Sequence, residues 1–136
     1  MSTARSGLLA SGARLNAAAS NVANAGVTGP LLSTRLPQPA ASEGSPRVYQ
    51  PVDVILRSIG DGGASTGVAA GYRPRLPADV RRYDPSAPFA DLDGLVAAPD
   101  VDLAAEAVSL MEAALSFKAN LAVLRAADEM TRAFST

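Results

Sequence analysis

The C-terminal segment constrains the fold of this chain most strongly. Residues 103–134 follow Pro99 and contain neither glycine nor proline, and Asp102 is a suitable N-cap. These features predict one continuous helix from Leu103 to about Phe134, which would be roughly 48 Å long at about 1.5 Å per residue. The remaining elements must therefore pack along one dominant helix.

Apolar side chains follow two lines along this predicted helix. Positions two residues apart on a helix point in nearly opposite directions, so the two lines lie on opposite faces. One line contains Val101, Val108, Leu115 and Ala122, with Met111, Ala126 and Met130 beside it, and the other contains Leu103, Leu110, Phe117 and Leu124. A helix that is apolar on both faces is normally buried among several others, and the pattern therefore predicts assembly with other chains.

Residues 1–25 predict a second helix with a narrow seam of small side chains. Leu8, Leu15 and Val22 are spaced by seven, and Ser11, Ala18 and Ala25 follow each of them by three. Its asparagines and serines compete for backbone hydrogen bonds, so we expect this helix to depend on a packing partner. We expect Leu8, Leu15 and Val22 to pack within the subunit against Val108, Met111, Leu115 and Ala122. We expect Leu110, Phe117 and Leu124 to meet neighbouring subunits.

Three asparagines in the N-terminal helix have two open interpretations. Asn16, Asn21 and Asn24 either face solvent or lie in a seam between subunits, where an asparagine can fix the register. The sequence does not decide between these alternatives.

The middle of the chain predicts loops and short strands. Residues 26–51 are rich in proline, glycine and serine and predict a loop, whereas residues 52–99 predict two to four short strands with a turn at the glycine cluster 60–63. We therefore predict a mainly α fold with a small β-rich middle, in which the terminal helices pair as an antiparallel coiled-coil-like hairpin. The segments 1–25, 26–51, 52–99 and 100–136 would form one structural domain.

Composition excludes most catalytic chemistry. The chain has no cysteine and no histidine, so it lacks thiolate nucleophiles, histidine bases and the ligands of typical zinc sites. We predict that it is not an enzyme and takes no cofactor, metal or small-molecule substrate. The net charge is -1, from 12 basic and 13 acidic residues, which predicts no nucleic-acid partner. We also expect no Sec signal and no membrane span, because continuous apolar runs are short.

Three further patterns suggest binding sites, and each has a simpler interpretation. The acidic run 91–94 partly resembles a calcium loop, but with Gly94 at the sixth position Phe89 takes the place of the first carboxylate. The arginines and tyrosines of residues 72–83 suggest a nucleic-acid patch, but aspartates in the same stretch oppose its field. The cluster 60–63 lacks the Lys-Ser/Thr tail of a phosphate-binding loop. We interpret these patterns as turns and surface ion pairs.

Two stretches resemble a known family. Residues 14–25, Arg-Leu-Asn-Ala-Ala-Ala-Ser-Asn-Val-Ala-Asn-Ala, resemble the N-terminal signature of the flagellar rod and hook family. Residues 83–102 and 116–124 are similar to the C-terminal half of the proximal-rod members. Together the matches cover roughly half the chain, and residues 31–46 show no resemblance.

The resemblance implies a structural role in an assembly. Its members are axial subunits whose terminal helices pair in the wall of the rod, in the periplasmic part of the basal body, after delivery by the flagellar type III export apparatus without a cleaved Sec signal. The implied partners are other rod subunits and copies of this chain. The alternative function is a cytosolic helical adaptor or export chaperone of a secretion system that shares only the heptad spacing.

Overall fold

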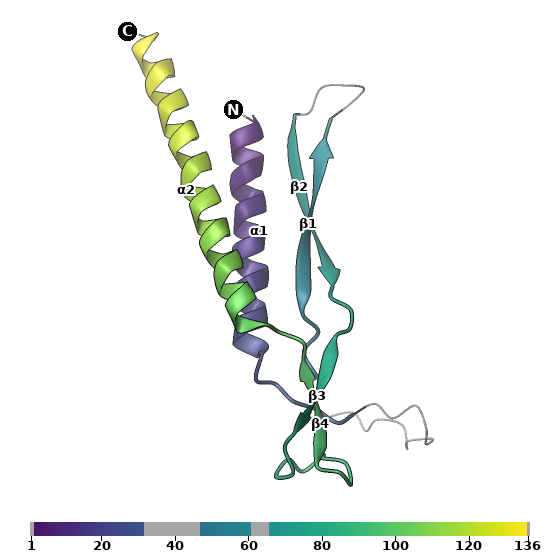
Figure 1. Ribbon diagram of the computed structural model, residues 1–136. Helices are drawn as coiled ribbons and strands as arrows, with labels where there is room; N and C mark the ends of the chain where they lie inside the picture. The colour runs from purple at the N-terminus through teal and green to yellow at the C-terminus, as the bar shows by residue number, and fades with distance from the viewer. Residues whose placement is uncertain (1, 32–46, 61–65, 136) are drawn as a thin grey trace.

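The computed structural model describes residues 2–31, 47–60 and 66–135. The element order is α1 (Ser2–Asn24), β1 (Val52–Ile59), β2 (Gly67–Pro74), β3 (Asp79–Tyr83), β4 (Leu95–Pro99) and α2 (Leu103–Ala133). Figure 1 shows α1 between α2 and the β1–β2 hairpin, with β3 and β4 at one end of the molecule. The predicted terminal helices and the small antiparallel strand region between them are confirmed.

Asp102, the predicted N-cap, fixes the start of α2. Asp102 has an extended backbone, and its carboxylate accepts hydrogen bonds from the amides of Ala104, at 2.9 Å, and Ala105, at 3.1 Å. These amides have no partner within the helix, so the cap satisfies two of its first donors.

The two helices lie side by side with opposite chain directions. Near the start of α1, Gly7 faces Asn120, and further along Ser11 Oγ lies 3.0 Å from Ser116 Oγ. At the end of α1, Asn21 contacts Glu106 near the start of α2. Because α2 is the longer helix, its C-terminal end continues past the first turn of α1 (Figure 1).

The β1–β2 hairpin is a two-stranded antiparallel sheet that lies against α1. Its register pairs Val52 with Pro74 and Ile59 with Gly67. Burial does not alternate along β1, because the first four residues are half-buried and the last four are exposed. A two-stranded ribbon has no layer that covers one whole face, so proximity to α1 determines which end is buried.

The second hairpin, β3–β4, is closed by a backbone contact from the segment after α1. The amide of Gly29 donates to Ala97 O at 3.0 Å, and the amide of Ala97 donates to Gly29 O at 2.9 Å. Part of the predicted loop 26–51 therefore pairs with β4, while residues 32–46 of that loop and residues 61–63 of the predicted glycine turn lie outside the described part.

The core is small and made mainly of alanine. Among the described residues, the buried hydrophobic ones are Ala10, Ala17, Ala18, Val96, Ala97, Ala98 and Ala113. An alanine removes little apolar area from water, so this core provides much less hydrophobic stabilisation than one of leucine or phenylalanine. Most of the large apolar side chains of α2 remain at the surface.

Candidate functional site

A buried polar cluster joins both helices to the β1–β2 hairpin. Asn21, at the end of α1, is 1% exposed and uses its side-chain amide in four hydrogen bonds. Its Nδ2 donates to Val52 O and to Glu106 Oε1, both at 3.0 Å. Its Oδ1 accepts from the Tyr49 hydroxyl and from the Val52 amide, also at 3.0 Å. This asparagine therefore satisfies the edge of β1 as another strand would.

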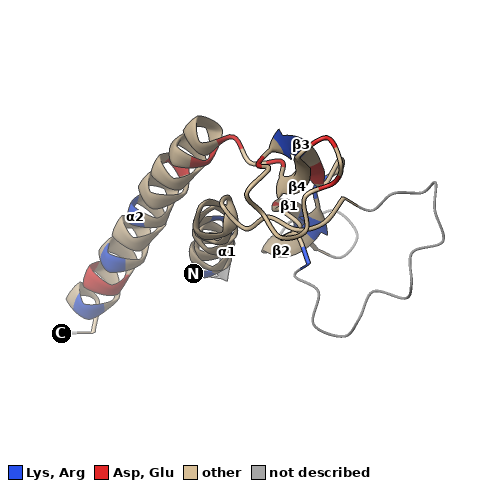
Figure 2. Ribbon diagram, turned by 90° about the horizontal axis from the view of Figure 1, so that it is seen from below, with Lys and Arg blue, Asp and Glu red and all other residues tan. Residues whose placement is uncertain are grey.

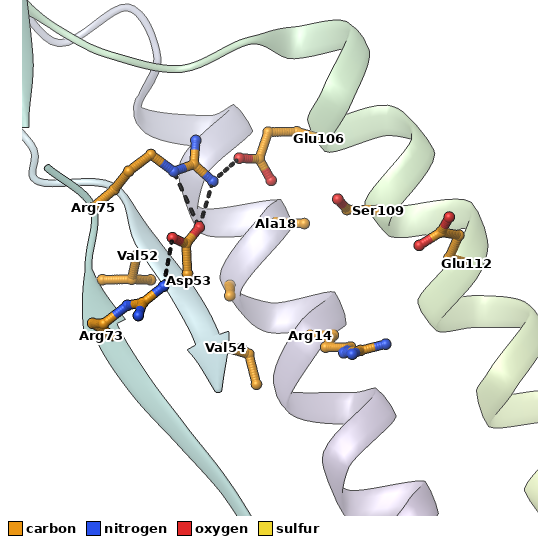
Figure 3. A pocket seen from close by; sticks show the side chains of 11 residues that line it. Arg14, Ala18, Val52, Asp53, Val54, Arg73, Arg75, Glu106, Ser109 and Glu112 are labelled. Atoms are coloured by element: carbon orange, nitrogen blue, oxygen red, sulfur yellow. Dashed lines mark hydrogen bonds and ion pairs between the residues drawn. The ribbon is translucent and has the colours of Figure 1, made fainter. Parts of the chain in front are cut away.

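Glu106 is the charged centre of this cluster. It is 3% exposed, and its Oε1 accepts from Arg75 Nη2 at 2.9 Å as well as from Asn21. Arg75 also binds Asp53 Oδ1 through Nε at 3.1 Å and Nη2 at 2.8 Å (Figure 3). A buried carboxylate is costly unless paired, and here one arginine and one amide compensate the charge. We name Tyr49, Asn21, Asp53, Arg75 and Glu106 the polar junction.

The electrostatics of the polar junction shift two pKa values. Hydrogen bonding to Asp53 and then to Glu106, opposed by partial burial, raises the pKa of Arg75 above its ordinary value. Burial, followed by the negative charge of Glu106, raises the pKa of Tyr49, although the charge of Arg75 opposes this. Arg75 therefore stays charged and the Tyr49 phenol stays protonated at neutral pH.

A groove of about 320 Å³ lies beside the polar junction. It is bounded by α1, α2 and the hairpin, and Figure 3 shows Arg14 on α1 and Ser109 and Glu112 on α2 around it. Within the described residues, no group of three or more Asp, Glu, His or Cys side chains is arranged to hold a metal ion. The groove is thus a mixed polar surface beside a structural cluster.

The α1–α2 seam consists of small residues in close contact. Ala113 on α2 is fully buried, and so are Ser11 and Ala18 on α1. A Cβ added to Gly7 would lie 2.6 Å from Asn120 Oδ1, so the Asn120 side chain in its present position lies directly over this glycine. The small residues of the predicted seam therefore form the buried contact with α2. Its larger residues are less buried, since Leu8 and Leu15 are half-buried and Val22 is exposed.

The structure reverses the predicted assignment of the two faces of α2. Met111 and Leu115, expected to pack inside the subunit, are 65% and 71% exposed, and Val108 and Ala122 are also exposed. The line expected to face neighbours lies closer to α1, since Leu110 and Leu124 are half-buried and Phe117, at 37% exposed, is less exposed than Met111 or Leu115. The face of α2 that meets α1 carries Glu106, Leu110 and Ala113, and the bond from Asn21 to Glu106 holds it there together with the contact between Ser11 and Ser116. We name Val108, Met111, Leu115 and Ala122 the outer stripe.

The three asparagines differ in environment. Asn21 is buried within the subunit, a position that neither proposed interpretation included, whereas Asn16 is exposed. Asn24 is half-buried, and its Nδ2 donates to Ser20 O at 2.8 Å. The remaining members of the polar junction were not predicted as a site. An acidic residue at position 106 in an otherwise apolar face of the predicted helix was the available signal.

The acidic run near β4 forms a tight turn. Asp91 Oδ1 accepts from the amides of Asp93, at 2.9 Å, and Leu95, at 2.8 Å. Gly94 has a φ of 73°, which favours glycine, and a Cβ there would lie 2.9 Å from the Tyr83 ring. The turn leaves Leu92 fully exposed.

The expectation that no segment could span a membrane is not supported for α2. By length and composition this helix is apolar enough to cross a bilayer, and 6% of its most apolar 18-residue window is buried. Figure 2 shows that positions of positive and negative residues nevertheless recur along it. An apolar helix in a bundle of helices has the same composition.

Comparison with known proteins identifies relatives over nearly the whole chain. The family model described as flagella basal body rod protein matches residues 1–30, and the one described as flagellar basal body rod FlgEFG protein C-terminal matches residues 92–136. The chain is 38% identical to the flagellar basal-body rod protein FlgC of Escherichia coli O6:H1 over 93% of its length and 87% of the relative. It is 37% identical to FlgC of Salmonella typhimurium over the same shares, and 36% identical to FlgC of Yersinia enterocolitica over 89% and 82%.

Proposed function

This chain belongs to the flagellar basal-body rod protein family, and we propose that its terminal helices form the contacts that build the rod. It is a structural subunit of the rod in the flagellar basal body, and it assembles with other rod components. In our proposal α1 and α2 act as one antiparallel coiled-coil-like hairpin in the wall of the rod. The chain then needs no catalytic group or cofactor, in keeping with a family that is generally non-enzymatic.

The outer stripe is the observation that carries this proposal. A long helix that exposes Val108, Met111 and Leu115 on one face presents an apolar surface that a soluble monomer rarely keeps. Burial of each such side chain contributes about 1.5–3 kcal/mol, which the small alanine core does not provide. Contact with neighbouring subunits would therefore supply much of the stability of the helices.

Neighbouring rod subunits cover the outer stripe better than lipid would. The C-terminal half of α2 carries Lys118, Arg125, Asp128, Glu129 and Arg132. Charged side chains within a bilayer are costly unless they are paired or reach the interface. Between protein helices the same residues can form ion pairs with complementary neighbours, so we assign no membrane span to α2.

We base the location of the chain in the rod and its route of export on the similarity to FlgC. We assign the chain to the proximal, periplasmic part of the rod, with delivery by the flagellar type III export apparatus and without a cleaved Sec signal. We treat residues 1–25, 26–51, 52–99 and 100–136 as segments of one domain. The adaptor or chaperone alternative is not favoured, because family models match both ends of the chain and FlgC proteins match most of its length.

A substitution in the outer stripe tests the proposal. Leu115→Asp places a charge where the free subunit is exposed, so the variant should fold as the parent does. We expect a strain that lacks this gene to swim when it carries Leu115→Met but not when it carries Leu115→Asp. Electron cryotomography should then show membrane rings with an absent or shortened rod.

The matched control is Leu92→Asp, because it makes the same chemical change at a fully exposed turn. We expect this control to swim. Normal swimming with Leu115→Asp would contradict the assignment of the outer stripe to subunit contacts.

A further inference from the structure

The β1–β2 hairpin directs alternate peptide groups outwards along both edges. In an antiparallel ladder, residue pairs that are bonded to each other alternate with pairs whose N–H and C=O point away from the partner strand. The amide of Arg75 donates to Pro51 O at 2.8 Å, which makes this a bonded pair. The pairs 52/74, 54/72, 56/70 and 58/68 therefore point outwards.

Side chains of α1 satisfy the outward groups at the beginning of each strand. The Val52 amide donates to Asn21 Oδ1 and the Val52 carbonyl accepts from Asn21 Nδ2, both at 3.0 Å. The Val68 amide donates to Ser6 Oγ at 3.1 Å. These contacts agree with the alternation and show that the fold supplies partners to outward groups where α1 is near.

Further along, both edges are uncovered. The outward peptide groups of Val54 and Leu56 on β1, and of Ala70 and Tyr72 on β2, have no hydrogen-bond partner in the part of the chain that the structure describes. Leu56 is 41% and Tyr72 is 57% exposed. Neither strand has a lysine, an internal proline or a bulge, which are common means of blocking an edge.

We propose that, in the rod, the β1 edge of one copy pairs with the β2 edge of a second copy of this chain. The added strand is antiparallel, with Val54 opposite Tyr72 of the second copy and Leu56 opposite Ala70 of the second copy. This inference rests on the proposed function, because rod assembly is what brings copies side by side.

The choice of a second copy follows from the match between the two edges. Val54 already lies opposite Tyr72 and Leu56 opposite Ala70 within the hairpin, as pairs that are not bonded to each other. The same register between copies turns both into bonded pairs, so every uncovered group on one edge meets one on the other.

Charge and symmetry favour the same partner. Asp53 would lie beside Arg73 of the second copy, whose own contact with Asp53 is a long 3.8 Å and whose side chain is mostly exposed. A contact between two different edges is heterologous, and such contacts repeat from subunit to subunit instead of closing a pair. Repetition is what an axial assembly needs.

Cysteine cross-linking tests this pairing directly, because the chain has no cysteine of its own. Two differently tagged variants, Val54→Cys and Tyr72→Cys, are produced together in a strain that lacks the gene, and basal bodies from swimming cells are oxidised. Bonded pairs have Cα atoms about 5.5 Å apart, within the range of about 4.4–6.8 Å that a disulfide requires. We expect a dimer that carries both tags.

Controls separate this inference from the proposed function. The dimer should be absent when either variant is produced alone and when Val54→Cys is combined with Leu92→Cys. The pair Leu56→Cys and Ala70→Cys is expected to cross-link in the same way. Swimming cells in which neither pair gives a doubly tagged dimer would overturn the edge pairing, while their intact rods would leave the proposed function standing.

Discussion

Asn21 and Glu106 lie 85 residues apart in the chain and share a buried hydrogen bond of 3.0 Å between Nδ2 and Oε1. This contact fixes the end of α1 against the start of α2, and through Val52 and Arg75 it also holds the hairpin. Because the apolar core is small, the polar junction largely determines how the two helices and the hairpin are placed relative to one another. Its consequences can be measured in the purified chain and in the rod.

Removing the Asn21 side chain should destabilise the subunit. Asn21→Ala leaves the Val52 N–H and C=O and the Tyr49 hydroxyl without the partner that Asn21 provides, and it removes one of the two hydrogen bonds to Glu106, which keeps Arg75. Buried groups left unpaired cost about 1–3 kcal/mol each, so we expect the free energy of unfolding to fall by about 3 kcal/mol. Urea unfolding followed by circular dichroism measures this change.

The control for that prediction is Asn16→Ala, an exposed position on the same helix. We expect its effect to stay within about 0.5 kcal/mol. Equal effects of the two substitutions would contradict a special role of Asn21.

Two glycines of α1 should respond differently to alanine. Gly12 has no atom within 4 Å of an added Cβ, so Gly12→Ala should stabilise the helix by about 1 kcal/mol. At Gly7 the new Cβ would meet the end of the Asn120 side chain, which must then rotate and give up its hydrogen bond to Ser116 O, and loss of such a bond costs about 1 kcal/mol. Thermal unfolding of both variants compares them, and equal stabilisation by Gly7→Ala and Gly12→Ala would show that Asn120 does not restrict position 7.

The polar junction should weaken in alkali through Tyr49. The pKa of this phenol is raised in the folded chain, so folding favours its protonated form. Its stabilising contribution is complete below the ordinary value of 10.0 and is lost as the pH rises through the raised folded value. We expect Tyr49→Phe to reduce this alkaline loss when unfolding is followed at several pH values. An identical pH profile for the variant would exclude Tyr49 as the cause.

The sequence predicted the helices better than it predicted their contacts. Glycine and proline mark where α2 can run, and Asp102 marks its beginning, so local chemistry suffices for its bounds. Which face of α2 meets α1 was predicted wrongly, because both apolar lines have the same spacing. Contacts between the helices, such as Asn21 with Glu106 and Ser11 with Ser116, distinguish the faces, and no local pattern joins residues so distant in the chain. For the same reason the contacts of Tyr49 and Arg75 were not predicted, because these residues lie in separate segments that meet only in the folded chain.

The central claim is that the outer stripe is covered in the assembled rod. Leu115→Cys introduces the only thiol of the chain at a position that is 71% exposed in the free subunit, and Leu92→Cys does so at the exposed turn. The measurement is the rate at which a maleimide labels each thiol in the purified chain and in basal bodies from swimming cells. We predict that both thiols react in the free chain and that assembly protects position 115 but not position 92. Equal labelling of Leu115→Cys in the free chain and in the rod would contradict the account.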